Sequence, residues 1–206
     1  MEAYLDNSAT TKINDEVLAL MDSAIVKLNK PYMDEAAPYF YERAELRAQA
    51  GKFKEAVMDY NTFHDAVLGK VTALFYFQRE QAEMQCRMYQ QALNDINKAV
   101  EMAPEDVDFW VEKGSVHLRV NQLDEAIAAF NKAISMNNQY AAAYRMLGYC
   151  QAMQKKNKEA CANFAKAKEL ETEKVVLHAQ LTESRVSIML SQIQPHFIYN
   201  ISHTTY

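Results

Sequence analysis

Glycine and proline are scarce, with only four of each among 206 residues. Because these residues mark most tight turns, their scarcity argues against a turn-rich β fold and against long disordered stretches. Half of the residues are apolar and 24% are charged, which is ordinary for a globular protein with a sizeable core. We therefore expect a mostly helical chain.

Other absences exclude classes of function. No glycine-rich phosphate loop occurs, and no His pair has metal-binding spacing, so neither cofactor nor metal is expected. With 22 basic and 27 acidic residues there is no basic stripe for nucleic acid. The three cysteines, Cys86, Cys150 and Cys161, form no C-x-x-C pair, and free thiols on helices are predicted.

Long hydrophobic runs are also lacking. No stretch of about 20 apolar residues is present, so no membrane span is expected. A positively charged start followed by an apolar run is missing too, and no secretion signal is predicted. The sequence therefore predicts a cytoplasmic protein, unless a leader has been removed.

What the chain does contain is a repeat. Four segments share an alanine, followed four residues later by a large side chain and three residues after that by Phe or Ala. These alanines are Ala56, Ala92, Ala126 and Ala160, at intervals of 36, 34 and 34 residues, and the large side chains are Tyr60, Ile96, Phe130 and Phe164. Spacings of four and three define one face of a helix.

A second helix is predicted before each of these. It carries an aromatic residue and, four residues later, a position that is small in three of the four cases. The pairs are Phe40 and Ala44, Tyr76 and Glu80, Trp110 and Gly114, and Tyr144 and Gly148. Small residues let two helices approach closely, while the aromatic rings fill the space between neighbouring hairpins. One hairpin cannot bury such a face alone, but stacked hairpins can.

These positions resemble the tetratricopeptide-repeat pattern. The matching residues are Trp110, Gly114, His117, Ala126, Phe130 and Ala133, then Tyr144, Leu147, Gly148, Ala160, Phe164 and Ala167, with Pro104 as the closing proline of the preceding repeat. The resemblance covers four repeats at residues 37–72, 73–106, 107–140 and 141–174. It implies an all-α fold, an α-solenoid of helix-turn-helix repeats in a right-handed superhelix, which acts as a protein-interaction scaffold and not as an enzyme.

The repeats depart from the pattern in places. The first has two extra residues near Leu68, and the second has Arg79-Glu80 where Leu-Gly is usual. Asn138 and Thr172 replace the closing proline in the third and fourth, which leaves the local turn geometry open.

Flanking segments are predicted to close the stack. Residues 14–36 form a half-repeat helix and linker, with Val17, Met21, Ala24 and Ile25 on one side. Residues 175–194 form a capping helix, with an apolar face of Leu177, Leu181, Ser184 and Ile188, which ends near Pro195 before a tail at 195–206.

The resemblance also implies a partner-binding groove lined by the first helix of each repeat. Its residues are Tyr41, Glu45, Phe77, Gln81, Met84, Val111, Ser115, Arg119, Arg145 and Tyr149. Aromatic, amide and methionine side chains suit a bound peptide or helix, although several of them could equally pack against the next repeat. Some family members bind a partner's C-terminal carboxylate through Lys, Asn and Arg. Here those positions hold Tyr41, Glu45, Gln78, Leu74, Asp108 and Glu112, so a carboxylate-clamp chaperone adaptor is not expected.

The two ends resemble parts of enzymes. Residues 4–21, opening with Tyr4-Leu5-Asp6-Asn7-Ser8, resemble the start of cysteine desulfurases. The large domain that would hold pyridoxal phosphate does not follow, so residues 1–13 are predicted not to fold independently. Residues 184–200 resemble the phosphoacceptor segment of sensor histidine kinases, with His196 as the acceptor beside Asn200.

Only six residues follow Asn200, so the nucleotide domain needed for phosphoryl transfer is not present in this sequence. A phosphotransfer or sensor fragment that uses His196 is the alternative to the scaffold. Enzyme-like segments at both ends also indicate a composite, chimeric chain of designed, generated, rearranged or misread origin.

Overall fold

The computed structural model describes residues 15–24 and 33–203, with the side chains of 33–35 and 190–203 left aside. Every secondary-structure element within these ranges is a helix. Contacts divide the chain into two units, Met1–Met136 and Asn137–Tyr206. The predicted all-α class is confirmed.

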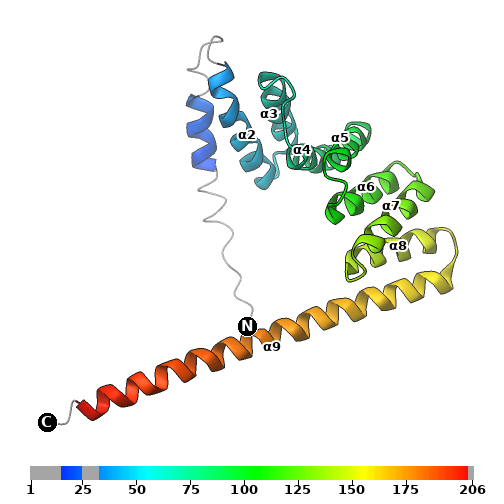
Figure 1. Ribbon diagram of the computed structural model, residues 1–206. Coiled ribbons are helices and arrows are strands. Elements are labelled where there is room, and N and C mark those ends of the chain that lie inside the picture. Colours follow the sequence, from blue (N-terminus) through cyan, green and yellow to red (C-terminus); the bar gives the residue numbers. More distant parts are fainter. Residues whose placement is uncertain (1–14, 25–32, 204–206) are drawn as a thin grey trace. The chain divides into compact units, whose positions relative to one another are not determined.

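The first unit is a row of helical hairpins (Figure 1). A helix at residues 15–24 is followed by three packed pairs. The pairs are α2 (Met33–Gln49) with α3 (Phe53–Ala66), α4 (Ala73–Gln85) with α5 (Tyr89–Met102), and α6 (Val107–Arg119) with α7 (Leu123–Met136). In addition, α3 contacts α4 and α5 contacts α6, so each hairpin packs against the next one.

The turn inside each hairpin has the same geometry. The second residue after the end of each first helix has a positive φ. These residues are Gly51 (74°), Arg87 (60°), Asn121 (61°) and Lys155 (60°). These positions are 36, 34 and 34 residues apart, the intervals of the sequence repeat. At each turn the next residue donates its N–H to a carbonyl five residues back, as in Lys52 to Arg47 and Met88 to Glu83. Such left-handed residues end helices by satisfying their last carbonyls.

The core of the first unit lies where the hairpins meet. The shared alanines Ala56 and Ala92 and the large side chains Tyr60 and Ile96 are at most 2% exposed. Phe75 joins them and lies edge-on to Tyr60, with ring centroids 5.7 Å apart. Burying these residues removes apolar surface from water at about 25 cal/mol per Å².

The inter-hairpin aromatic residues are buried to different degrees. Phe40 and Tyr76 are buried, whereas Trp110 and Tyr144 are half-buried. The indole N–H of Trp110 donates to the Pro104 carbonyl over 2.8 Å. The ammonium group of Lys113 lies 5.3 Å from the Trp110 ring centroid, a cation–π distance.

Close helix approach explains the glycine of the third hairpin. A Cβ added to Gly114 would lie 2.5 Å from Cε1 of the fully buried Phe130. In the second hairpin the same position holds Glu80, and the opposing residue is the smaller Ile96. A smaller partner thus leaves room for a side chain at position 80.

In each of the first two hairpins, a buried ion pair joins the two helices. Arg43 donates to both carboxylate oxygens of Asp59, at 2.8 and 2.6 Å, and Arg79 does the same to Asp95, at 2.6 and 2.9 Å. Both arginines and both aspartates are 36 residues apart, so the pair is a repeated feature of these hairpins. Bidentate geometry makes such pairs strong and directional.

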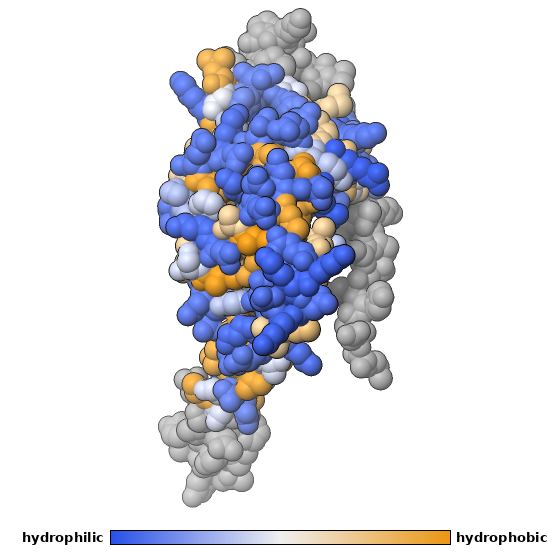
Figure 2. All heavy atoms as spheres, turned by 90° about the vertical axis from the view of Figure 1, so that its right-hand side faces the viewer, coloured by the Kyte–Doolittle hydropathy of each residue, from blue (hydrophilic) through white to orange (hydrophobic). Residues whose placement is uncertain are grey.

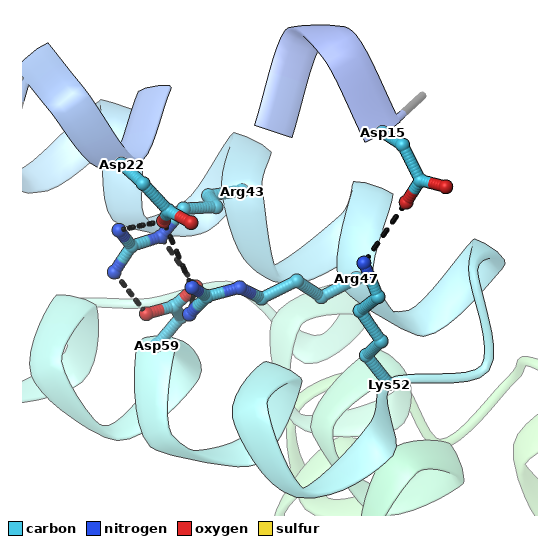
Figure 3. A network of polar contacts seen from close by, with 6 residues as sticks. All are labelled: Asp15, Asp22, Arg43, Arg47, Lys52 and Asp59. Atoms are coloured by element: carbon cyan, nitrogen blue, oxygen red, sulfur yellow. Dashed lines mark hydrogen bonds and ion pairs between the residues drawn. The ribbon is translucent and has the colours of Figure 1, made fainter. Parts of the chain in front are cut away.

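The helix at residues 15–24 docks through the same network (Figure 3). Asp22 accepts from Arg43 and Arg47 at 2.7 and 2.9 Å, and Arg47 also reaches Asp59. The predicted apolar face of this helix is wrong in detail. Leu18 is the anchor, at 4% exposure, whereas Val17 and Ala24 are exposed. Ile25 lies outside the described residues.

The second unit contains α8 (Ala141–Met153) and α9 (Asn157–His203). α8 packs along the first part of α9. Gly148 lies against Phe164, and a Cβ added to Gly148 would lie 3.1 Å from the Phe164 ring. Buried residues of α9 include Ala160, Ala167 and Leu170. These contacts form the fourth hairpin.

α9 differs from the expectation at its far end. In place of a fourth repeat followed by a separate capping helix, one helix runs to His203 and passes Pro195, where the sequence predicts an end. Residues 171–189 are all exposed, so Leu177 and Leu181 are not buried against the fourth hairpin as the capping role requires. Thr172 stands where the repeat pattern has a proline, and because threonine does not break a helix, α9 can continue. The Thr172 hydroxyl donates to the Lys168 carbonyl of the same helix over 2.8 Å.

Candidate functional site

The predicted groove residues lie on the first helix of each hairpin, beside its fully buried residues, and Tyr41, Phe77 and Met84 pack against the core. α4 buries Phe75, Tyr76, Arg79, Glu80, Ala82 and Glu83. The first-helix surface, as we call it, is the other face of α2, α4 and α6 in the first unit. It carries Tyr41, Glu45, Phe77, Gln81, Met84, Val111, Ser115 and Arg119.

A chain of hydrogen bonds joins α2 to α4 on this surface. The Tyr41 hydroxyl donates to Oε1 of Gln78, and Nε2 of Gln78 donates to Oε1 of Glu45. Burial, with the nearby Glu45 carboxylate, raises the pKa of Tyr41, so its hydroxyl keeps its proton at neutral pH. Sequence reasoning missed the central role of Gln78, because a contact across 33 or 37 residues leaves no local pattern.

Two predicted groove aromatics are also packing residues. The Tyr41 ring lies 5.2 Å from that of Phe63, and the Phe77 ring lies 5.0 Å from that of Phe109 on α6. Phe77 therefore connects α4 to α6, just as Gln78 connects α2 to α4. The alternative interpretation, that some of these residues pack against the next repeat, holds for both.

The remaining positions of the first unit differ in accessibility. Gln81 and Arg119 are exposed, whereas Met84, Val111 and Ser115 are half-buried. The Ser115 hydroxyl bonds to the Val111 carbonyl of its own helix over 3.1 Å. Amide, thioether and guanidinium groups are thus presented between apolar side chains. On the face seen in Figure 2, apolar side chains likewise emerge as separate groups among hydrophilic ones.

Carboxyl groups dominate the electrostatics beside this surface. Burial raises the pKa of Glu112 on α6, an effect that Arg119 partly offsets. Behind it, burial together with Glu112 and Glu83 raises the pKa of Glu80 to about 9. Burial and Asp95 raise the pKa of Glu83 to about 8. Neither oxygen of the fully buried Glu80 has a hydrogen-bond partner.

Two predicted residues belong to the second unit. Arg145 on α8 forms an exposed ion pair with Glu171 at 2.8 Å, and the Tyr149 side chain is 53% exposed. The side chain of His196 and all of residues 1–14 lie outside the described residues.

A metal site and a membrane span each place their own requirements on the described residues. Among them, no group of three or more His, Cys, Asp or Glu residues is arranged to hold a metal ion. Within the same ranges, no helix combines the length and the apolar character that a membrane span requires. Of the three free cysteines, Cys150 is buried and Cys161 exposed.

Sequence comparisons match the helical repeats. A family model described as tetratricopeptide repeat matches residues 81–141 and 111–171. Sperm-associated antigen 1 of Mus musculus is 31% identical over 87 residues, which is 42% of this chain and 9% of that protein. The peptidyl-prolyl cis-trans isomerase FKBP4 of Bos taurus is 27% identical over 131 residues, which is 57% of this chain and 28% of that protein. The chain thus spans less than a third of the length of either curated relative.

Solved structures share the fold. The crystal structure of MamA aligns with a TM-score of 0.69 at 20% identity, covering 85% of this chain and 98% of that one. YrrB, described as a TPR protein with an unusual peptide-binding site, aligns with a TM-score of 0.66 at 20% identity, covering 84% and 86%. The chain therefore has an all-α helical-repeat fold, and the family model identifies tetratricopeptide repeats within residues 81–171. The resemblances of residues 4–21 and 184–200 to enzyme segments stay predictions.

Proposed function

We propose that the chain is a non-catalytic scaffold that binds a peptide or a helix of another protein along the first-helix surface. The observation that carries the proposal is the continuity of this surface. Gln78 joins α2 to α4, and Phe77 joins α4 to α6, so that the exposed Gln81 and Arg119 and the half-buried Met84 belong to one connected face. The peptide-binding site of YrrB, a protein of similar fold, supports this kind of ligand.

The chemistry of the surface narrows the class of ligand. Exposed amides such as Gln81 and Gln85 can pair with a peptide main chain, and Met84 can adapt to apolar side chains. Glu45 and Glu112 stand where a carboxylate clamp would need cations. We therefore expect an internal peptide or a helix with apolar and basic side chains, and not a free C-terminal carboxylate.

A pull-down with matched variants tests the proposal. The double variant Gln81→Arg with Gln85→Arg adds two positive charges to the proposed surface. The control, Gln90→Arg with Asn94→Arg, adds the same charge at the same spacing on exposed positions of α5. Proteins captured from a cell extract by the wild type and the control should be lost with the surface variant, as followed by mass spectrometry.

Retention of the same proteins by the surface variant would place the binding site elsewhere. Far-UV circular dichroism and thermal unfolding should be the same in all three proteins, because the four glutamine and asparagine side chains are exposed. This check separates a lost contact from a lost fold.

A further inference from the structure

The second half of α9 carries apolar side chains that remain exposed in the described part of its unit. Leu170 is the last buried residue among the described side chains of the helix, at 5% exposure. Beyond it, Leu177 is 67% exposed and Leu181 is 49% exposed, although both are as large and apolar as Leu170. A solvated helix has no need of leucines in register with its buried face. These side chains are suited to a partner.

Their spacing indicates what shape of partner fits. Leu170, Lys174, Leu177, Leu181, Ser184 and Ile188 follow one another at intervals of four, three, four, three and four residues. Alternating steps of four and three residues repeat every seven residues, which is the heptad period of a coiled-coil seam, and a second helix is the structure that follows such a seam. From Leu170 to Ile188 this seam spans 18 residues, or roughly 27 Å of helix, and α9 itself continues to His203.

The charge on this segment favours a second copy of the same helix. Residues 175–189 carry one acidic side chain, Glu183, one basic side chain, Arg185, and His178, so two copies side by side do not repel. Lys174 is the one charged residue of the seam. A lone lysine at such a position specifies register and is tolerated in a two-stranded coil, where its ammonium group can reach solvent.

The packing of α8 decides the relative direction. α8 occupies one side of α9 up to Leu170. In an antiparallel pair, the partner's helix after Ile188 would run back along this part and meet α8. In a parallel pair, both α8 helices lie before the seam and leave it open.

From these observations we propose that the chain forms a homodimer through a parallel two-stranded coiled coil of its α9 helices, with Leu177 and Leu181 at the centre of the seam. The dimer displays two copies of the tetratricopeptide repeats. It is independent of the ligand proposed for the first-helix surface, and either proposal can fail alone.

The mass of the full chain in solution tests the dimer. Sedimentation equilibrium of the wild type at micromolar concentration should give twice the monomer mass of 23.6 kDa. Leu177→Glu with Leu181→Glu should give the monomer mass. As a matched control, Val175→Glu with Val186→Glu changes side chains that are 69% and 47% exposed but lie outside the seam, and it should remain dimeric. A monomeric wild type, or equal dissociation of both variants, would overturn the proposal.

Disulfide trapping tests the direction. In a chain with Cys86, Cys150 and Cys161 replaced by alanine, Ser184→Cys places a thiol at the same level of both helices in a parallel pair. Mild oxidation should therefore link the two copies, whereas Thr182→Cys, on another side of the helix, should link far less. A dimer that Ser184→Cys does not link would rule out the parallel coil.

Discussion

Glu80 shows how one residue departs from a repeat at a cost. It occupies the position of Gly114 and Gly148, where the helix backbones approach closely, and its side chain is fully buried. A buried carboxyl without a hydrogen-bond partner loses its hydration and gains nothing in return. Its proton is retained at neutral pH, because burial has raised its pKa from 4.5 to about 9.

This raised pKa predicts that stability falls as the solution becomes alkaline. The folded state keeps a proton that the unfolded state releases above pH 4.5, so the free energy of unfolding decreases as pH rises from 4.5 to about 9. Glu80→Gln removes the titrating group. Urea unfolding should show similar stability for variant and wild type near pH 5, and an advantage of more than about 1 kcal/mol for the variant at pH 9.

Glu101→Gln is the control for this titration, because Glu101 is an exposed carboxyl on α5. It should leave the pH dependence unchanged. If Glu80→Gln and the wild type lose stability in parallel up to pH 9, the carboxyl of Glu80 is hydrated and ionised in the folded protein, contrary to its burial here.

The two glycine positions at the helix crossings should differ in tolerance. Gly114→Ala directs a Cβ to within 2.5 Å of the fully buried Phe130 ring, which has no room to move. Gly148→Ala meets Phe164 at 3.1 Å, and Phe164 is 41% exposed. We expect Gly114→Ala to cost about 1–3 kcal/mol, and Gly148→Ala markedly less, in denaturant unfolding. Equal costs would mean that the two hairpins pack alike.

At the scale of elements, the hairpin turns can be improved. Arg87 holds a left-handed conformation at φ 60°, where Gly51 stands in the first hairpin. Arg87→Gly should increase the free energy of unfolding by about 0.5–1 kcal/mol, because glycine adopts this conformation without steric strain. The midpoint of thermal unfolding should rise accordingly. The reverse test is Gly51→Ala, whose Cβ would have nothing within 4 Å, so that any loss reports the backbone alone. A destabilised Arg87→Gly protein would show that the arginine side chain is needed there.

The helix at residues 15–24 depends on one leucine. Leu18 is 4% exposed and Leu20 is 71% exposed on the same helix. Leu18→Ala should cost about 2 kcal/mol or more, whereas Leu20→Ala should change stability by less than about 0.5 kcal/mol. Hydrogen exchange of the amides in 15–24 measures this locally. Protection that survives Leu18→Ala would assign the docking to the Asp22 ion pairs instead.

The pairing of helices into hairpins could be predicted from the sequence. The same spacing of Ala56 and Tyr60, which marks one face of a helix, recurs every 34–36 residues. The polar side-chain contacts that join these helices, within a hairpin or between hairpins, could not be predicted. Nothing near Arg43 or Arg79 in the sequence indicates an aspartate 16 residues later as its partner, and Gln78 lies 33 residues from Glu45. The continuation of α9 had a readable signal, since neither Gly nor Pro interrupts residues 157–194, but the repeat length suggested a boundary at 174.

At the scale of the whole molecule, we assign the two units different tasks. The first unit supplies a connected face of α2, α4 and α6, on which Tyr41 and Phe77 pack and Gln81 and Arg119 remain accessible. The second unit supplies α9, whose exposed leucines suit a second copy. The repeat fold by itself specifies neither the ligand of the first-helix surface nor the partner of α9, because binding depends on the exposed side chains and not on the fold.

Site-specific photo-crosslinking tests most directly whether a protein partner binds the first-helix surface. A photoreactive phenylalanine analogue is placed at Gln81 on α4 in one protein and at Met58 on α3 in another; Met58 is 67% exposed and lies on a second helix. After irradiation in a cell extract, we expect a crosslinked partner from position 81 and little or none from position 58. Crosslinking to the same partner from position 58, with none from position 81, would contradict binding at this surface.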